Sequence, residues 1–369
     1  MPVPSNRLDL IYFKYKREFD EKAVSVLSSN RYILGPELEA FEREFAAASG
    51  ARRCVGVACG LDALKIAMHV AGVGPGDEVI VQANTFIAGP LAVSANGATP
   101  VFVDVGEDFA MSPSETERAI TPATKAVLVT HLFGLPTPME PFVGLCEKHG
   151  LALIEDCAQA HGSKYKGRPV GTFGHAGCFS FYPTKTLGGF GDGGGIITDL
   201  DDLADRATVY RNYGSEKKYY NREQGVNSRL DELQAGLLRV KLKHFDELLA
   251  ERAALAGRYL AGINNPLIRL PSPAPGSECA WHQFVIRCGT RDRLAQYLRD
   301  AGIGTEIHFP VPVHLSEAYK ELLGRTGKLP VAERLAGEIL SLPFFNGLTY
   351  DEQSRVIKAL NAYQTDPTI

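Results

Sequence analysis

The sequence predicts an α/β fold in which a largely parallel sheet lies between layers of helices. Short apolar runs typical of buried strands alternate with segments whose apolar residues recur every three or four positions. Residues 55–58 form one such run and lead directly into a helical pattern at Gly60, and residues 152–155 form another, after a helical pattern at residues 139–148. Strands that alternate with helices pair in parallel and are covered on both faces.

The other elements of this sheet follow in chain order. Pro36 is placed to be the first residue of a helix, because the apolar residues that follow it recur at helical spacing. Gly72 ends the helix that begins at Gly60, and a Pro-Gly turn follows it. The sequence predicts further strands at residues 78–82, 100–105, 126–130, 178–181 and 195–198, and a helix at residues 85–95.

The C-terminal third is predicted to be a smaller α+β domain. Residues from 229 to about 261 are strongly helical and form a connector into it. The boundary divides a large domain, residues 1–245, from a small one, residues 246–369. Within the small domain the patterns predict strands at residues 282–287 and 304–308, and helices at residues 291–301 and 332–340.

Composition narrows the class of protein. The chain has 369 residues, of which 45% are hydrophobic and 22% charged, as expected for a soluble enzyme with a large core. A net charge of −4 without a basic block argues against a nucleic-acid partner. Without an apolar run of membrane-spanning length or a secretion signal, we expect no membrane association. Seven cysteines in such a chain indicate the reducing cytoplasm.

One lysine stands where a predicted strand runs into a glycine-rich loop. The stretch SFYPTKTLGGFGDGGG, residues 180–195, turns at a Pro-Thr-Lys corner, and six glycines follow Lys185. A lysine at a strand end with a flexible loop beyond it is suited to forming an imine with a carbonyl cofactor. The alternative is an ordinary surface lysine in a loop.

A carboxylate ends another predicted strand upstream. Asp156 follows the apolar run at residues 152–155. An acid there can keep a pyridine nitrogen protonated, as pyridoxal phosphate requires in order to act as an electron sink. The alternative is that Asp156 caps a helix that starts at Cys157. Lys185 and Asp156 together predict a pyridoxal phosphate site.

The phosphate of such a cofactor is expected at the helix that begins with Gly60 and Leu61. A helix N-terminus offers free N–H groups and the positive end of a dipole, and Ser180 and Asn227 can add side-chain donors. The alternative is a simple tight turn between strand and helix. Phe86 lies at a strand–helix junction and either stacks on the pyridine ring or belongs to the core.

For the other motifs, the surrounding sequence decides whether their usual function is predicted. Residues 189–194 match GxGxxG, but a strand follows them instead of a helix, so dinucleotide binding is not predicted. Histidines and cysteines show no ligand spacing, so we predict no metal site, and Cys54 and Cys59 are expected to be small core residues. The segment IHFPVPVHL, residues 307–315, carries His308 and His314, which are expected to line a substrate cleft.

These segments resemble the DegT/StrS family of nucleotide-sugar aminotransferases, within the fold-type I pyridoxal phosphate enzymes. The resemblance runs from ILGPELEAFE, residues 33–42, to IHFPVPVHL. Its most specific parts are EDCAQAHG (residues 155–162), SFYPTKTLGGFGDGG (residues 180–194) and GVNSRLDELQAGLL (residues 225–238). It implies a mostly parallel seven-stranded sheet between helices, plus a smaller C-terminal α+β domain.

The resemblance also implies roles for the matching residues. Lys185 is expected to form the imine with pyridoxal 5′-phosphate, Asp156 to pair with the ring nitrogen, and Gln159 to lie beside the ring. In this family the phosphate-binding asparagine comes from the neighbouring subunit, which implies a homodimer with shared active sites. The implied phosphate ligands are Ser180, the amides of Gly60 and Leu61, and Asn227.

Three comparisons with the family pattern qualify these expectations. Many members have a hydroxyl residue where Leu61 stands, which removes one side-chain contact to phosphate and leaves the backbone amide. Many have PGKN where this chain has PTKT at residues 183–186, which affects the loop and not the lysine. Dehydratase-like members have histidine at the lysine position, so Lys185 argues against that branch.

Three motifs indicate the subgroup, namely GLDAL at residues 60–64, RNYGSEKKY at residues 211–219 and IHFPVPVHL. They are most similar to enzymes that move an amino group from L-glutamate to C3 of a dTDP-linked 3-keto-6-deoxyhexose. Such amino sugars enter surface polysaccharide, including lipopolysaccharide O-antigen, or secondary-metabolite glycosylation. The alternatives are amination at C4 of a 4-keto sugar linked to GDP or UDP, and a regulator that binds a sugar nucleotide without chemistry.

The nucleotide-linked keto sugar is expected to meet several residues. The basic ones are candidates for its pyrophosphate, whereas the alternative is that they form a solvated charged loop. The predicted substrate residues are Tyr182, Lys217, Lys218, Tyr219, Arg229, His308 and His314.

Overall fold

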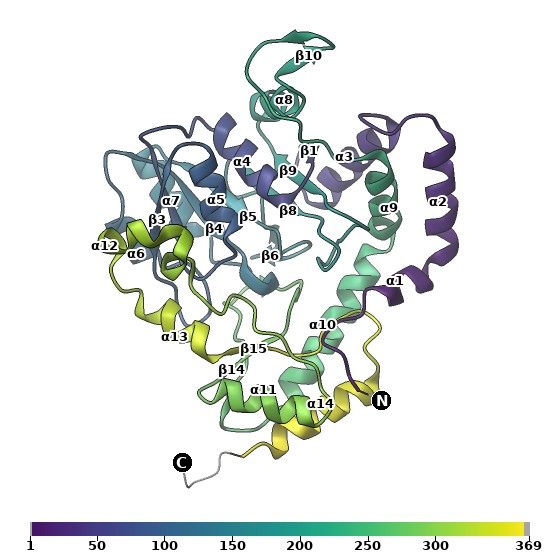
Figure 1. The fold of residues 1–369 in the computed structure, drawn as a ribbon, viewed down its shortest axis with the longest axis vertical. Coiled ribbons are helices and arrows are strands. Elements are labelled where there is room, and N and C mark those ends of the chain that lie inside the picture. The colour runs from purple at the N-terminus through teal and green to yellow at the C-terminus, as the bar shows by residue number, and fades with distance from the viewer. Residues whose placement is uncertain (1, 365–369) are drawn as a thin grey trace.

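A computed structural model describes residues 2–364 of the chain (Figure 1). Its largest element is a seven-stranded sheet with strand order β1-β9-β8-β5-β4-β2-β3. The strands are β1 (Arg53–Val57), β2 (Glu78–Gln82), β3 (Thr99–Val103), β4 (Thr124–Thr130), β5 (Ala152–Asp156), β8 (Ala176–Ser180) and β9 (Gly194–Thr198).

The sheet is parallel except around one strand. The pairs β2·β3, β2·β4, β4·β5 and β5·β8 are parallel, whereas β9 runs antiparallel to both β8 and β1. The loop after β8 is therefore a reversal that returns to the neighbouring position in the same sheet. The predicted α/β class with a mostly parallel seven-stranded sheet is confirmed.

Helices cover both faces of the sheet (Figure 1). One face packs against α4 (Gly60–Val70), α5 (Ala88–Ala95) and α8 (Asp201–Tyr210). The other packs against α3 (Pro36–Ala48), α9 (Glu232–Lys243) and α7 (Glu140–His149). Shorter helices of this part are α1 (Asp9–Lys14), α2 (Lys16–Ser28), α6 (Pro113–Arg118) and the 3-10 turn η1 (Leu132–Gly134).

Two helix termini form as their residues predict. Pro36 is the first residue of α3, where its missing N–H costs no intrahelical hydrogen bond. Gly72 follows the end of α4 with φ +86°, a left-handed conformation that disfavours residues with a Cβ.

Several predicted elements are shorter in the structure, including the strand expected at residues 282–287, which begins only at Val285. The helix expected at residues 85–95 begins only at Ala88, because residues 85–87 bend over the end of β2. The strand expected at residues 304–308 is reduced to a single bridge between Glu306 and Ser341. Residue propensities alone do not predict that this strand is shortened, because a strand requires a hydrogen-bonding partner along its length.

The helical segment after Arg229 is two helices and not one. α9 ends at Lys243, His244 has non-helical dihedral angles (φ −104°, ψ 12°), and α10 (Phe245–Gly262) follows. Figure 1 shows α10 passing into the C-terminal part, where α11 and α14 lie. One continuous core cluster contains residues from both sides of position 245. The division into a large and a small domain at this position therefore stays a prediction.

The C-terminal part is built around a small antiparallel sheet of order β12-β14-β15. Its elements are β12 (Ile268–Arg269), β14 (Val285–Cys288), α11 (Arg291–Asp300), η2 (Val313–Leu315), η3 (Glu317–Leu322), α12 (Leu323–Thr326), α13 (Pro330–Glu338), β15 (Ile339–Ser341) and α14 (Tyr350–Ala362). Two small sheets complete the fold, namely β6 (Lys164–Tyr165), β7 (Arg168–Pro169) with β13 (Ser277–Glu278), and β10 (Ser215–Lys217) with β11 (Tyr220–Asn221). None of the helices among residues 2–364 combines the length and apolar character needed to cross a bilayer.

Candidate active site

A cavity of about 520 Å³ lies at the carboxyl end of the parallel strands. β5 ends at Asp156, β8 ends at Ser180, and β1 leads through Cys59 into Gly60; all of these residues line the cavity, as does Lys185. Parallel strands place their carboxyl ends on one edge of a sheet, so residues far apart in sequence converge there. Lys185 and Asp156 therefore face the same space.

Lys185 stands on the turn that follows β8. Its amide donates to the carbonyl of Tyr182 at 2.8 Å, which closes the Pro-Thr-Lys corner. Burial of the amine lowers the pKa of Lys185 to about 8, while the carboxylate of Asp156 acts in the opposite direction. A lysine with this pKa is partly neutral near pH 7 and can act as a nucleophile or as a base.

Asp156 is buried, with only 5% of its surface exposed. One carboxylate oxygen, Oδ1, accepts a hydrogen bond from the amide of Ala158 at 3.0 Å. Burial raises the pKa of Asp156, and the Ala158 hydrogen bond and the charges of Lys185 and His131 oppose this effect. No helix starts at Cys157, because residues 157–163 form turns, so Asp156 is not a helix cap.

The start of α4 forms a cradle beside Ser180. Cys59 precedes the helix in an extended conformation and makes no side-chain cap hydrogen bond. A Cβ at Gly60 would lie 2.6 Å from Cβ of Ser180, and a Cβ at Gly194 would lie 2.3 Å from the carbonyl oxygen of Cys59. Only glycine permits these approaches, which leave the helix terminus open toward the cavity.

Four other predicted residues line the same cavity. Gln159 is held in place because its Oε1 accepts from the amide of Phe133 at 2.7 Å. Phe86 is 56% exposed and not part of the core, and its ring lies 5.9 Å from that of Phe309. Tyr182 is exposed at the rim of the cavity. The Nδ1 atom of His308 lies 2.8 Å from the Ser341 hydroxyl, and burial lowers the pKa of His308.

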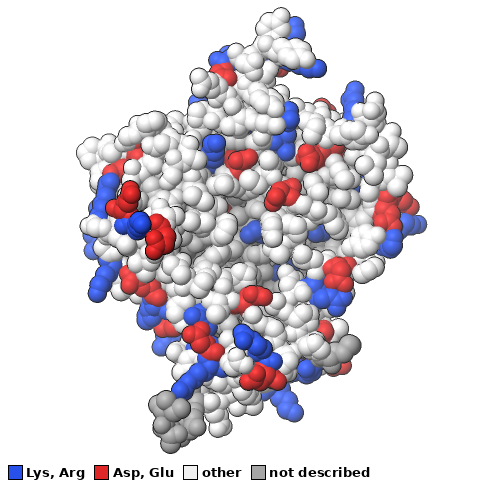
Figure 2. Space-filling model, in the orientation of Figure 1, with Lys and Arg blue, Asp and Glu red and all other residues white. Residues whose placement is uncertain are grey.

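The predicted nucleotide-binding segment lies outside this cavity. Lys217, Lys218 and Tyr219 are exposed on the β10–β11 hairpin, which projects from the body of the molecule (Figures 1 and 2). Arg229 binds the side chain of Asn212 at 2.9 Å and stacks its guanidinium on Tyr213. None of these residues lines the cavity of its own chain.

Two further predicted residues are also absent from the cavity lining. Asn227 is exposed and lies in a backbone bridge with Asn212. His314 is buried on η2, and its Nε2 atom lies 3.3 Å from a carboxylate oxygen of Glu333 on α13, so it packs against α13 and does not line the cavity. Sequence spacing could not distinguish His314 from His308, because only tertiary packing decides which histidine faces the cavity.

The structure adds His282, Gln283 and Phe309 to the cavity lining. Nδ1 of His282 and Oε1 of Gln283 are buried and have no hydrogen-bond partner among residues 2–364. Buried polar atoms are normally paired, so they are available to a bound molecule. The only sequence signal for His282 and Gln283 was that they form a polar pair inside the apolar stretch AWHQF, residues 280–284.

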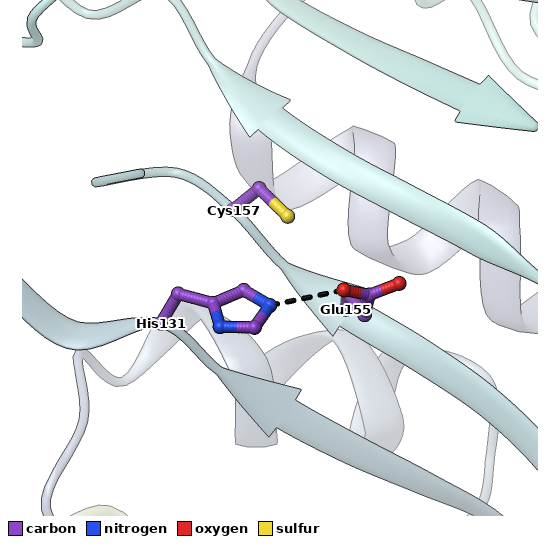
Figure 3. Close-up of side chains that lie close together, drawn as sticks. All are labelled: His131, Glu155 and Cys157. Atoms are coloured by element: carbon purple, nitrogen blue, oxygen red, sulfur yellow. Dashed lines mark hydrogen bonds and ion pairs between the residues drawn. The ribbon is translucent and has the colours of Figure 1, made fainter. Parts of the chain in front are cut away.

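His131, Glu155 and Cys157 form a buried cluster at the carboxyl ends of β4 and β5 (Figure 3). Nδ1 of His131 accepts from the amide of Thr137 at 3.1 Å, so Nε2 carries the proton and donates to Glu155 Oε2 at 3.0 Å. Oε1 of Glu155 accepts from the amides of residues 173 and 174. Burial raises the pKa of Cys157, which keeps it a thiol. The hydrogen bonds of this cluster therefore fix the end of β5, where Asp156 lies.

The sequence profile of the DegT/DnrJ/EryC1/StrS aminotransferase family matches residues 14–361. This chain belongs to that family. It is 47% identical over 363 residues to the dTDP-3-amino-3,4,6-trideoxy-alpha-D-glucose transaminase of Streptomyces venezuelae, covering 98% of this chain and 96% of the relative. It is also 47% identical over 364 residues to the erythromycin biosynthesis sensory transduction protein EryC1 of Saccharopolyspora erythraea, covering 98% of this chain and 100% of that protein.

Among solved structures, the fold matches DesV of S. venezuelae in complex with a ketimine intermediate, with a TM-score of 0.96 and 47% identity. The match covers 99% of this chain and 100% of that one. The predicted family, the fold-type I architecture and the assignment as an aminotransferase are thereby confirmed. The predicted cofactor is confirmed as well, since the family depends on pyridoxal phosphate and solved relatives hold it as pyridoxamine phosphate.

The residues of this cavity fit that cofactor. The open start of α4 and the Ser180 hydroxyl would hold the phosphate, since N–H groups at a helix terminus favour an anion. The buried Asp156 carboxylate would face a protonated ring nitrogen, which would remove the unfavourable isolation of its charge. Lys185 is the only lysine that lines the cavity among the described residues, and it would carry the covalent link.

Proposed function

We propose that the enzyme transfers an amino group from L-glutamate to C3 of a dTDP-linked 3-keto-6-deoxyhexose. The observation that carries the proposal is the shared cavity of Lys185 and Asp156 in a chain with 47% identity to a transaminase named for a dTDP-3-amino sugar. When bound, pyridoxal phosphate supplies the electron sink that allows an amino group to exchange for a carbonyl oxygen.

The residues of the chain divide the remaining work. The Lys185 amine, with a pKa of about 8, can take up and return the proton of the reacting carbon. The Asp156 carboxylate, oriented by the Ala158 amide, would keep the ring nitrogen of a bound cofactor protonated and thus positively charged. The Gln159 side chain, fixed by the Phe133 amide, limits the movement of a molecule bound in the cavity. The Asp156 and Gln159 side chains are held by backbone amides before a substrate arrives, which lowers the cost of reorganisation.

The nucleotide is proposed to bind across a dimer. Lys217 and Lys218 are exposed on a hairpin that projects away from the cavity of their own chain, and Asn227 also lies outside that cavity. A homodimer would let this segment reach a partner's cavity and complete its phosphate and pyrophosphate contacts. The nucleotide would then anchor the substrate at a distance from the reacting carbon.

Two alternatives are weighed against this proposal. Amination at C4 of a GDP- or UDP-linked 4-keto sugar would use the same cavity, and only the placement of the sugar would differ. The name of EryC1 points to a regulator. The catalytic lysine, the aspartate and the open helix terminus together support the enzyme, because sugar binding alone requires none of them.

The cellular setting is also part of the proposal. We place the enzyme in the cytoplasm, where its nucleotide-sugar substrate is made, and all seven cysteines are free thiols. The amino sugar would enter surface polysaccharide, such as lipopolysaccharide O-antigen, or a glycosylated secondary metabolite.

A panel of substrates tests the proposal. The purified enzyme is incubated with L-glutamate and with 3-keto and 4-keto sugars linked to dTDP, GDP or UDP, and 2-oxoglutarate formation is measured. We expect turnover with the dTDP-linked 3-keto sugar and an amino group at C3 of the product. Turnover with 4-keto sugars alone would assign C4. A visible spectrum that does not respond to glutamate would favour the regulator.

A further inference from the structure

A second cavity of about 250 Å³ meets the first one at Lys185. Both cavities are lined by Thr184, Lys185, His282, Gln283 and His308, so a molecule at the Lys185 amine can extend into either of them. The second cavity lies between the loop after β8, the start of α1 and the C-terminal part. Its chemistry differs from that of the first, because the charged groups that line it are basic except for Glu306.

Two buried cations line the second cavity without forming an ion pair within residues 2–364. Lys241 is 6% exposed; its ammonium donates to the carbonyl of Gly188 and lies 5.2 Å from the ring centre of Phe190. Burial lowers the pKa of Lys241 to about 8, and no neighbouring carboxylate acts against this. An unpaired buried ammonium is unfavourable unless an anion joins it.

Arg252 is the second of these cations and is also 6% exposed. Its guanidinium donates to the carbonyls of Trp281 and His282, at 2.9 and 2.6 Å, and to the Asn346 side chain at 3.0 Å. Glu251 next to it is engaged by the Asn346 side chain and the Gly347 amide. Of the five N–H groups of a guanidinium, the described contacts leave two of Arg252 unused.

The lining as a whole is positive. Lys185, Lys241 and Arg252 face a single lining carboxylate, Glu306, which accepts from the Ser5 hydroxyl at 3.1 Å. The Nδ1 atom of His282 is buried, has no hydrogen-bond partner within residues 2–364 and belongs to a residue of the same lining. This combination of unpaired buried cations and an unpartnered polar atom describes an anion site.

We propose that Lys241 and Arg252 bind a carboxylate of the dicarboxylic amino donor. This proposal rests on the proposed transamination. A donor whose amino group lies at Lys185 has its carboxylates only a few bond lengths away, within reach of an adjoining small cavity. The pyrophosphate of a sugar nucleotide lies farther from the reacting carbon and requires the larger cavity. The two substrates would thus share the reaction centre while their anionic groups occupy separate cavities.

Calorimetric titration with glutarate, an unreactive dicarboxylate, tests the site on the cofactor-loaded enzyme. The Lys241→Met variant should weaken glutarate binding about 10-fold or more, as expected for the loss of a charged hydrogen bond. The matched control is Lys243→Met on the same helix, since Lys243 is exposed and pairs with Glu18. It should change binding less than about 2-fold, as expected for a surface ion pair. Absence of glutarate binding to the wild type, or equal effects of both variants, would overturn the proposal.

A second measurement separates carboxylate binding from support of the loop through Gly188. The two half-reactions are followed separately, with glutamate on the pyridoxal form and with the keto sugar on the pyridoxamine form. Carboxylate binding predicts that Lys241→Met impairs only the glutamate half, and that Lys241→Arg largely restores it. Equal impairment of both halves would assign Lys241 a structural role. If the wild type failed with every keto sugar but still bound glutarate through Lys241, the proposed function and not the anion site would be contradicted.

Discussion

The cavity at the carboxyl end of the sheet and the segment from Lys217 to Arg229 were both predicted to carry site residues, but they are built differently. In the cavity, Asp156 at the end of β5, Gly60 at the start of α4 and Lys185 on the turn after β8 all line one space. Residues 217–224 of the other segment are exposed, and its hairpin projects from the body of the molecule. Lys185 and Asp156 therefore come together within one chain, whereas the residues predicted to bind the nucleotide lie apart from them.

Replacing Lys185 is expected to have the largest effect. In Lys185→Ala, turnover should fall by about 10⁴-fold, because a positioned proton-transfer group contributes up to about that factor. The visible absorbance of the bound cofactor should disappear as well. Steady-state kinetics and absorbance spectra measure both. Full activity in this variant would mean that the chemistry lies elsewhere in the molecule.

Asp156→Asn should have the next largest effect. An amide cannot hold the ring nitrogen protonated, so turnover should fall by about 10² to 10³-fold, comparable to the loss of one preorganised electrostatic contact. Cofactor content should remain substantial, because the phosphate cradle is unchanged. Rates of the glutamate half-reaction provide the measurement. Unchanged rates would show that Asp156 does not pair with the ring.

Subunit mixing tests whether the exposed segment serves a neighbouring cavity. Asn227→Asp should lose activity, because a carboxylate repels the cofactor phosphate. After mixing this variant with Lys185→Ala, about a quarter of the wild-type activity should return, since half of the dimers are mixed and each has one intact site. No recovery after verified subunit exchange would place Asn227 in the site of its own chain or outside any site.

Gly60→Ala should have a smaller effect, confined to the cavity. The new Cβ would lie 2.6 Å from Cβ of Ser180, so the start of α4 must shift. The overpacking should destabilise the fold by about 1 to 3 kcal/mol, and pyridoxal phosphate should bind about 10-fold more weakly. Gly74→Ala is the control, because nothing lies within 4 Å of its Cβ position. Equal affinities in both variants would argue against the phosphate cradle.

The pH dependence of cofactor uptake should show the smallest effect. Only the neutral amine attacks the aldehyde, and the pKa of Lys185 is lowered to about 8. Uptake by the apoenzyme should therefore rise with pH and level off above about 8, with about one tenth of the amine neutral at pH 7. Because the Asp156 charge raises the pKa of Lys185, the Asp156→Asn profile should level off at a lower pH. Stopped-flow absorbance measures both profiles, and a shift to higher pH would contradict this coupling.

Much of the cavity could be predicted because its residues sit at the ends of regular elements. The alternation of apolar runs predicted the parallel sheet, and a parallel sheet brings its strand ends to one edge. Lys185, Asp156, Gly60 and Ser180 followed from that rule. Local patterns were less informative where packing decides, as with the helix that begins only at Ala88 and the strand at residues 304–308 that is reduced to one bridge.

The amino-acid sequence by itself determined the fold class, the lysine–aspartate pair and the glycine that begins α4, because periodicity and the chemistry of element ends are local properties. Tertiary structure alone decided which of two neighbouring histidines, His308 or His314, faces the cavity. It also decided that Lys241 and Arg252 share a second cavity with Lys185. These contacts join segments far apart in the chain, and only the packing of the C-terminal part against the sheet brings them together.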